Sequence, residues 1–434
     1  MLQTQININR VRILSFCFCA FILMSSLFAG DGQIDIRPTG TATFTISNPG
    51  SYILTDNVTM TADAHCINIM TSNVTLDLNG HTITGNGSNY SGIYGSGACG
   101  ITIFNGTVSD FGGNGIKLSV NCRLVDITVN SNGGHGVELD DACQLTHVTA
   151  VNNDGFGIKT LTGCVIDSCV ASYNTGGIGI EAGLNCTVKN CTANNNGVTS
   201  GDASLDVAGI SADNGSVIIG CSSWKNQNKS TGAGSVCGIK AGQGCTVINN
   251  SCHENKAENA GKFCIGIDAS HGSTLIGNTC YNNDSTGENS ISIGIDCGLR
   301  SVVKDNACSD NTATGDTGAQ AYGIRTTTGD CLIVGNNCIE NDGNAYSYGI
   351  AVGGDHNRIE NNLCTGNNAG SGAGIFLSNQ ADDCVVIRNT TSTNDAGINL
   401  GGKDAYCAEN MSTDGIINSA SATMGTGDRS NIAY

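Results

Sequence analysis

The sequence is poor in residues that mark several common protein classes. It has 434 residues, with 2 Pro, 1 Trp, 5% aromatic residues and 13% charged residues. Because Pro is scarce and the 61 Gly follow no strict three-residue period, the chain is not collagen-like. Basic residues are few as well. The 19 Lys and Arg stand against 37 Asp and Glu, and the net charge of −18 excludes a nucleic-acid binder that relies on counterion release.

The abundant residues narrow the fold class further. Gly, Asn, Thr and Ser are poor residues for helix interiors, which argues against a helical bundle. The hydrophobic content of 39% is too high for a disordered chain and low for a single spherical core. An all-β or solenoid protein remains.

An apolar run lies at the N-terminus. Arg10 and Arg12 precede an apolar stretch over residues 13–28, and Ala29-Gly30 follows it. This order of a basic segment, an apolar segment and a small residue predicts a secretory signal peptide over residues 1–29. An uncleaved anchor is the alternative, but the run is shorter than the roughly 20 residues that span a bilayer. No later stretch is long enough to cross a membrane, so we expect a secreted, periplasmic or cell-surface protein.

A repeat of 21 to 30 residues runs along almost the whole remaining chain. Each repeat contains Gly followed by Ile or Val, here called the anchor pair, and 13 such pairs extend from Gly92 to Gly397. A short β-branched run and a polar turn follow the pair, and one Asn then recurs in eleven consecutive repeats. These residues are Asn132, Asn153, Asn174, Asn196, Asn226, Asn255, Asn283, Asn311, Asn341, Asn367 and Asn394.

Short strands separated by Gly and Asn turns, with like residues at like positions, predict the coils of a parallel β-helix. The period also fits leucine-rich repeats, but their Leu-x-x-Leu-x-Leu frame is absent. Like residues of a β-helix stack about 4.7–4.9 Å apart, so each buried Asn amide can bond to the amides above and below it. This removes a burial cost of roughly a few kcal/mol for each group. We therefore expect a structural asparagine ladder.

The beginning of the repeat region resembles a known family. Gly50-Ser-Tyr-Ile-Leu-Thr, the stretch Asn73-Val-Thr-Leu-Asp-Leu-Asn-Gly-His-Thr-Ile-Thr-Gly85 and the Gly-Ile coils resemble secreted right-handed parallel β-helix repeat proteins of the pectin-lyase-like superfamily. The resemblance covers nearly all of residues 32–434 and implies an all-β fold, a single-stranded right-handed parallel β-helix (solenoid), for which the repeats predict about 14 coils. It leaves activity open, because the fold hosts lyases, hydrolases, epimerases and adhesins. The expected parts are the signal peptide (1–29), an N-terminal cap with the first strands (30–66), parallel β-helix repeats (67–400) and a C-terminal coil and cap (401–434).

The cysteines follow the coils. Of the 23 Cys, Cys17 and Cys19 lie in the predicted signal peptide, which leaves 21. Cys exchanges with Ala, Ser or Asn at equivalent repeat positions, and this favours small buried thiols. Several disulfides are the first alternative, since export permits them, although stacked side chains point the same way. A soft-metal site is the second, but the chain lacks the usual ligand spacing.

Charged residues follow the anchor pairs. Side chains alternate along a strand, so the residue after each pair should point outward. Four consecutive residues of this kind near the start of the repeats alternate in charge and predict a self-neutralising surface row: Lys117, Glu138, Lys159 and Glu181. Further along, two acids stand between two bases: Lys240, Asp268, Asp296 and Arg325.

The second set is the candidate site. The turn before the anchor pair is longest in the same repeats, which favours a groove beside these charges. Carboxylates about 5–5.5 Å apart suit a retaining glycosidase. Alternatively, Asp268 and Asp296 bind Ca²⁺ while Lys240 or Arg325 abstracts a sugar proton, as in lyases. If these four residues have no function, they are simply the solvent-exposed charges of a strand surface.

We predict a secreted or cell-surface β-helix module without enzymatic activity, which binds glycans, envelope proteins or neighbouring proteins through its long face. The alternative is a polysaccharide lyase or glycoside hydrolase with a groove along the Gly-Ile strand around Lys240–Arg325. An aromatic content of 5% offers few platforms for sugar stacking and counts against tight glycan capture. No cofactor is required, apart from the Ca²⁺ of the lyase alternative. The expected partners are a polysaccharide or a cell-surface protein, not nucleic acid.

Overall fold

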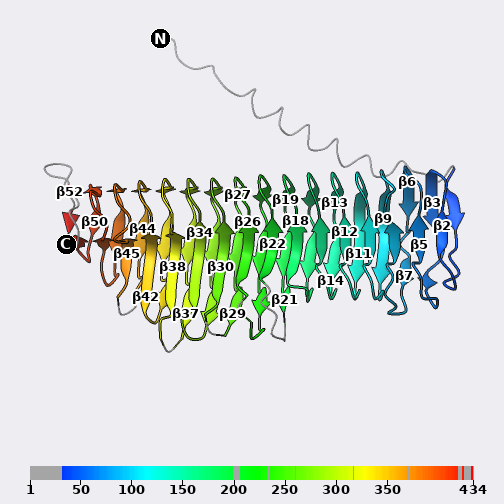
Figure 1. Cartoon of the computed structure of the whole chain (residues 1–434), viewed down its shortest axis with the longest axis horizontal. Helices are drawn as coiled ribbons and strands as arrows, with labels where there is room; N and C mark the ends of the chain where they lie inside the picture. The colour runs from blue at the N-terminus through cyan, green and yellow to red at the C-terminus, as the bar shows by residue number, and fades with distance from the viewer. Residues whose placement is uncertain are drawn as a thin grey trace, which may run out of the picture.

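The computed structural model describes residues 32–198, 206–232, 234–259, 261–315, 317–368, 371–418, 423–424 and 432–433. The predicted signal peptide lies outside these ranges. Within them the chain folds into short parallel strands without a helix, so no helix that could span a membrane is found there. Figure 1 shows the resulting rod, in which successive coils are stacked in chain order.

The strands that carry the anchor pairs form, together with two strands that precede the first pair, a 16-stranded parallel sheet, here called the anchor sheet. The Ile of the pair is fully buried, and the residue after it points outward, as the alternation of a strand requires. The last strand carries a further pair, Gly415-Ile416, which agrees with about 14 coils. The strands are β2 (Phe44–Ile46), β5 (Ile67–Ile69), β8 (Ile93–Gly95), β10 (Ile116–Leu118), β12 (Val137–Leu139), β15 (Ile158–Thr160), β18 (Ile178–Ala182), β22 (Val207–Ala212), β26 (Val236–Ala241), β30 (Phe263–Ala269), β34 (Ile291–Cys297), β38 (Gln320–Thr326), β42 (Tyr346–Val352), β45 (Ala373–Leu377), β48 (Ile398–Leu400) and β51 (Ile416–Asn418).

The remaining faces of the rod belong to a second parallel sheet of 31 short strands. Two rows of strands merge in it because β9 (Thr102–Ser109) and β11 (Arg123–Asn130) run through both rows. The first half of β11 pairs with β13 (Gln144–Thr146) and the second half with β14 (Thr149–Val151). The inward side chains of both sheets meet in one continuous hydrophobic core along the rod.

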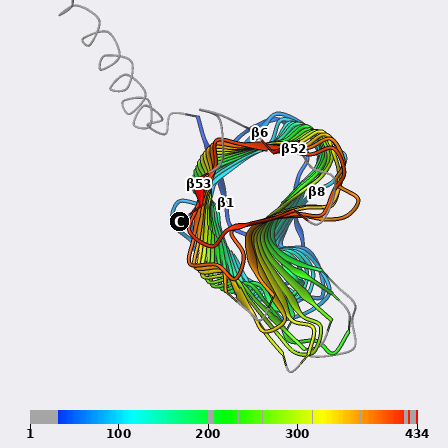
Figure 2. The ribbon, with the colours of Figure 1, turned by 90° about the vertical axis from the view of Figure 1, so that its left-hand side faces the viewer.

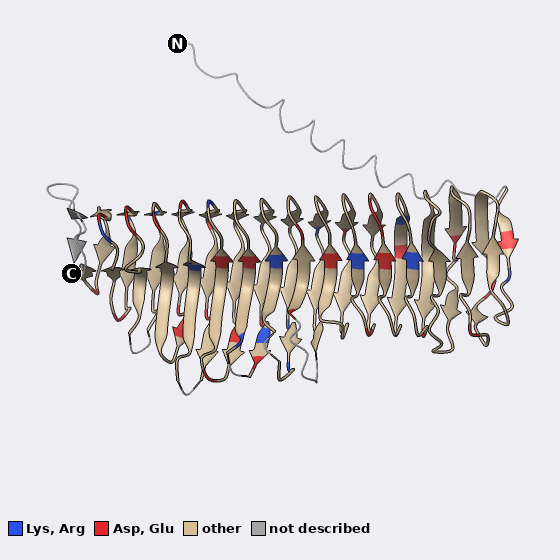
Figure 3. Ribbon diagram, viewed as in Figure 1, with Lys and Arg blue, Asp and Glu red and all other residues tan. Residues whose placement is uncertain are grey.

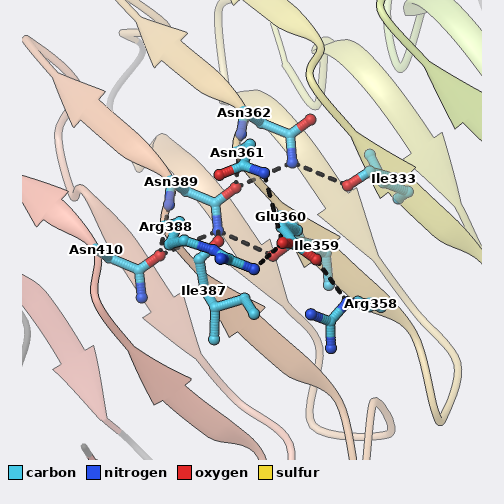
Figure 4. Close-up of polar contacts among 10 residues, drawn as sticks. All are labelled: Ile333, Arg358, Ile359, Glu360, Asn361, Asn362, Ile387, Arg388, Asn389 and Asn410. Carbon is cyan, nitrogen blue, oxygen red and sulfur yellow. Dashed lines mark hydrogen bonds and ion pairs between the residues drawn. The ribbon is translucent and has the colours of Figure 1, made fainter. Parts of the chain in front are cut away.

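The predicted asparagine ladder is present. Asn311, which is fully buried, donates from Nδ2 to Oδ1 of Asn341 at 2.8 Å and to the Cys280 carbonyl at 3.1 Å. A second ladder occupies the position at which Cys and Asn exchange. Figure 4 shows three of its rungs, Asn362, Asn389 and Asn410, joined by bonds of 2.9 and 3.0 Å.

The longest turns of the sequence are partly strands. They form a third parallel sheet of six strands, here called the lobe, which protrudes from the rod when it is viewed end-on in Figure 2. Strands form here because consecutive coils carry insertions of similar length, which pair in register. The adjoining anchor strands also lengthen, from three residues in β12 to seven in β30. The lobe strands are β21 (Gly197–Val198), β25 (Gln227–Asn228), β29 (Lys256–Glu258), β33 (Asp284–Thr286), β37 (Thr312–Thr314) and β41 (Asp342–Gly343).

Candidate functional site

A row of charges runs along the outer face of the anchor sheet, as Figure 3 shows. In its first part Lys117 lies 2.9 Å from Glu138, and Lys159 lies 3.5 Å from Glu181. These side chains are about a quarter to a third exposed, so each pair contributes only about 0.2–1 kcal/mol. This part of the row is a self-neutralising surface, as predicted.

The four candidate residues lie side by side in the next part of the row. Lys240 is in register with Asp268, which is in register with Asp296 on the following strand. Arg325 is the next residue in the row, directly opposite Asp296. The structure therefore brings together all four residues that the sequence singled out.

Three of these four charges have a partner. Arg325 binds Asp296 through two hydrogen bonds, Nε to Oδ1 at 3.2 Å and Nη2 to Oδ2 at 2.5 Å, and each side chain is 18% exposed. The Lys240 ammonium lies 2.9 Å from Oδ2 of Asp206, a residue that the sequence analysis did not identify. Asp206 directly precedes β22, and the equivalent residues of the following coils, Ser235 and Phe263, are not acidic, so the repeat does not reveal it.

Asp268 is the exception. Its partly buried carboxyl forms no hydrogen bond or ion pair with the described residues. Burial raises the pKa of Asp268 to about 6, and the charge of Asp296 acts in the same direction against Lys240 and Arg325. A carboxyl group with this pKa gains and loses its proton close to neutral pH, so Asp268 is the one acid of the pair suited to proton transfer.

Replacing Asp268 by Asn is expected to stabilise the protein above neutral pH. A carboxyl group with a pKa near 4 when unfolded and near 6 when folded holds its proton more tightly in the folded state. The free energy of unfolding of the wild type therefore falls by about 1–3 kcal/mol as the pH rises between these values. In Asp268→Asn this decrease should be absent, because the amide does not titrate. Urea unfolding of both proteins at pH 4 and pH 8 measures this change in the free energy of unfolding.

The control for this measurement is Asp35→Asn, at an exposed position on β1 (Ile34–Ile36). The difference in free energy of unfolding between this variant and the wild type should be equal at the two pH values. An Asp268→Asn variant that gains nothing between pH 4 and pH 8 would contradict the shifted pKa.

Aromatic side chains gather beside Arg325. Tyr348 stacks on Phe376 with ring centroids 4.7 Å apart, and it packs against Tyr322 at 5.5 Å and Tyr346 at 6.1 Å. The Arg325 guanidinium lies 5.5 Å from the Tyr322 ring. These four aromatic residues, here called the aromatic bay, line a hollow of about 230 Å³ together with polar groups. Its polar lining includes Gln320, Arg325, Thr326, Thr327 and Ser378.

The aromatic bay is not evident from the total aromatic content of 5%. The available signal was positional. Tyr322 and Tyr348 each precede the glycine of an anchor pair in consecutive coils, and Phe376 takes the outward position of the next coil. Equivalent positions of consecutive coils are neighbours in a β-helix, so a few aromatic residues suffice for a local cluster.

A family model described as a right-handed beta helix region matches residues 91–235, which fits the parallel coils. The chain is a right-handed parallel β-helix protein. A comparison of this β-helix with curated protein sequences gave no match.

Solved structures of similar fold share few residues with this β-helix. The Dettilon tailspike protein (gp208) is 13% identical with a TM-score of 0.41, and the match covers 69% of this chain and 58% of the tailspike. The periplasmic alginate epimerase AlgG is 13% identical with a TM-score of 0.41 over 87% and 79% of the two chains. The A-module of the Azotobacter vinelandii mannuronan C-5 epimerase AlgE6 is 13% identical with a TM-score of 0.39 over 87% and 92%. Similarity at this level concerns the fold alone.

The cysteines of the β-helix are free thiols in the described residues, and all except Cys99 are buried. Five of them stack in register on consecutive coils, from Cys252 to Cys364, and point into the core. This agrees with the interpretation as small core residues. Within the described ranges no group of three or more His, Cys, Asp or Glu side chains is placed to hold a metal ion.

Proposed function

We propose that this β-helix is a secreted, periplasmic or cell-surface module that binds a glycan along the outer face of its anchor sheet. The observation that carries the proposal is the aromatic bay, in which the exposed Tyr346 and the partly exposed Phe376 stack on the buried Tyr348 beside a cation in a shallow hollow. The C–H faces of a sugar ring pack against aromatic rings, and its hydroxyl groups bond to polar side chains such as Gln320 and Thr326. Both kinds of group line the same hollow.

Charge favours a neutral glycan. The positive charge of Arg325 is balanced by the carboxylate of Asp296, to which it is bound by two hydrogen bonds. The neighbouring Asp268 has no such partner among the described residues and carries a negative charge above pH 6. A uronic acid or sulfated sugar would meet this charge, whereas a neutral sugar would not.

A polysaccharide lyase or glycoside hydrolase is the second candidate, and the pKa of about 6 for Asp268 favours it. In this case Asp268 acts as general acid or base. A retaining glycosidase also needs a second free carboxylate, but both oxygens of Asp296 accept hydrogen bonds from Arg325. The same bonds compete with a Ca²⁺ ion at Asp268 and Asp296. The geometry therefore supports binding better than catalysis.

Replacing Tyr346 by Ala is expected to weaken glycan binding about three- to tenfold, since an aromatic contact contributes about 0.5–1.5 kcal/mol. Tyr346 is 41% exposed and stacks on Tyr348, so its loss should leave the fold intact. The wild-type chain is first screened against immobilised neutral and acidic polysaccharides, and the affinity of the variant is then measured on the best ligand.

Tyr406→Ala is the matched control, because Tyr406 is 37% exposed but lies on β49 (Tyr406–Ala408) in the other sheet. It should bind like the wild type. Equal losses in the two variants, or no binding to any polysaccharide, would refute the proposed site. Depolymerisation of the ligand by the wild type and not by Asp268→Asn would favour the enzyme instead.

A further inference from the structure

A buried lysine lies inside the lobe, away from the aromatic bay. Lys262 directly precedes β30 and is only 1% exposed. Its Nζ donates to the Ser230 carbonyl at 2.6 Å and to Oδ1 of Asn228 at 3.2 Å, and it lies 3.5 Å from Oγ of Ser230. All three acceptors are neutral oxygens. A lysine at this depth is ordinarily paired with a carboxylate, and no ion pair of Lys262 exists among the described residues.

This environment favours the neutral amine. Burial lowers the pKa of Lys262, and the Glu258 carboxylate opposes this effect only in part. Glu258 itself is engaged with Lys256 at 3.3 Å and with Gln227 at 2.6 Å. A neutral amine has a free electron pair, and a buried lysine in this state is a nucleophile.

The amide of Asn228 faces this amine. Asn228 is fully buried, and its Oδ1 accepts hydrogen bonds from the Ser230 N–H at 3.0 Å and the Ser230 hydroxyl at 2.7 Å in addition to the Lys262 amine. Donors aimed at a carbonyl oxygen stabilise the negative charge that develops there when a nucleophile attacks the carbon. Because the C=O bond is about 1.23 Å long, the amide carbon lies within about 4.5 Å of Nζ, roughly 1 Å beyond attack distance.

We propose that Lys262 and Asn228 form an intramolecular isopeptide bond. The electron pair of the neutral Nζ attacks Cγ of Asn228, and the charge on Oδ1 is held by the two donors of Ser230. The Cγ–Nδ2 bond then breaks, a proton from Nζ passes to the leaving nitrogen, and ammonia departs. One amide is exchanged for another, so the step needs no oxidant, reductant or other reactant.

The bond would join neighbouring coils of the lobe. Asn228 ends β25, and Lys262 follows β29, which pairs with β25. The lobe segments have only small cores of their own, separate from the main core of the rod. A covalent link at this point would tie two of these segments together beside one of the small cores.

Mass spectrometry of the purified full chain tests the proposal. The intact mass of the denatured wild-type protein should be lower by one ammonia molecule than the sequence mass, which is calculated here from the N-terminal residue that the peptide map identifies, so that removal of residues 1–29 is taken into account. A protease digest should contain a branched peptide that joins Lys262 to Asn228, and fragmentation of this peptide locates the bond. Because it is read from the wild type, the result does not depend on whether a variant folds.

Lys262→Arg is the first control, since a guanidinium remains charged and does not attack the amide. Its intact mass should equal its sequence mass, as should that of Asn228→Ala. A folded wild-type protein whose mass equals its sequence mass, with Lys262 and Asn228 recovered in separate linear peptides, would overturn the proposal. Ammonia lost at any other residue, as located in the peptide map, would overturn it as well.

Discussion

Replacing Asn311 by Leu is expected to destabilise the β-helix by on the order of 3–5 kcal/mol. The Asn311 side chain is fully buried and sits in the middle of the ladder. Its Oδ1 accepts from Nδ2 and the backbone N–H of Asn283 at 2.9 and 3.3 Å, and its Nδ2 donates to Asn341 and to the Cys280 carbonyl. Leucine is of similar size but removes all four bonds. A buried group left without any partner costs about 1–3 kcal/mol, but Nδ2 of Asn283 keeps its bond to the Cys252 carbonyl and Oδ1 of Asn341 keeps its bond from the backbone N–H at position 311, so the total stays below four such costs.

Urea unfolding followed by circular dichroism measures this loss. Asn399→Ala is the control, because Asn399 lies on β48 in the outward row and forms no hydrogen bond within the described residues. It should remain within about 0.5 kcal/mol of the wild type. Since coils of a solenoid can unfold separately, hydrogen exchange at the coils of Asn283 and Asn341 should rise first. Equal stability of the two variants would mean that the ladder contributes little.

The ladder is also the feature that the sequence predicted best. A buried amide column requires the same residue at the same place in every coil, so the repeat itself reveals it. The same holds for Ile267 and Ile295 of the anchor pairs, which are fully buried, and for the charged residues that follow them. Where equivalent residues of successive coils stack on one another, their spacing in the sequence is enough to predict that they are neighbours in the structure.

The features that no period reveals could not be predicted in this way. Asp206 neutralises Lys240 from the preceding coil, but no acid recurs at its position, where the following coils carry Ser235 and then Phe263. The lobe strands depend on insertions of similar length, whose sequences differ from coil to coil. The partners of Asp296 and the isolation of Asp268 follow from side-chain directions on adjacent strands, since Arg325 turns toward Asp296 and leaves Asp268 alone. The catalytic and calcium-binding roles of this row stay predictions.

Replacing Gly294 by Ala is expected to destabilise the protein by about 3 kcal/mol, because the added methyl group has no space. A Cβ at Gly294 would lie 2.6 Å from the carbonyl oxygen of Gly323 and 2.8 and 3.0 Å from Cβ and Sγ of Cys308. Two of these three atoms belong to backbone or Cβ positions, which cannot rotate away. The stacked coils would therefore have to move apart locally.

Gly272→Ala provides the comparison, because its φ of +70° is a left-handed conformation but no atom lies within 4 Å of an added Cβ. This substitution should cost about 1–2 kcal/mol through backbone strain alone. If Gly272→Ala costs as much as Gly294→Ala in urea unfolding, close approach is not the reason for the anchor glycine. A larger loss of unfolding free energy for Gly294→Ala would instead show that the close approach of neighbouring strands requires the anchor glycine. A Cβ at the anchor would meet Cys308 beside Gly294, Ala171 beside Gly157 and Ser223 beside Gly209, so the anchor must be Gly whichever small residue the inward row holds.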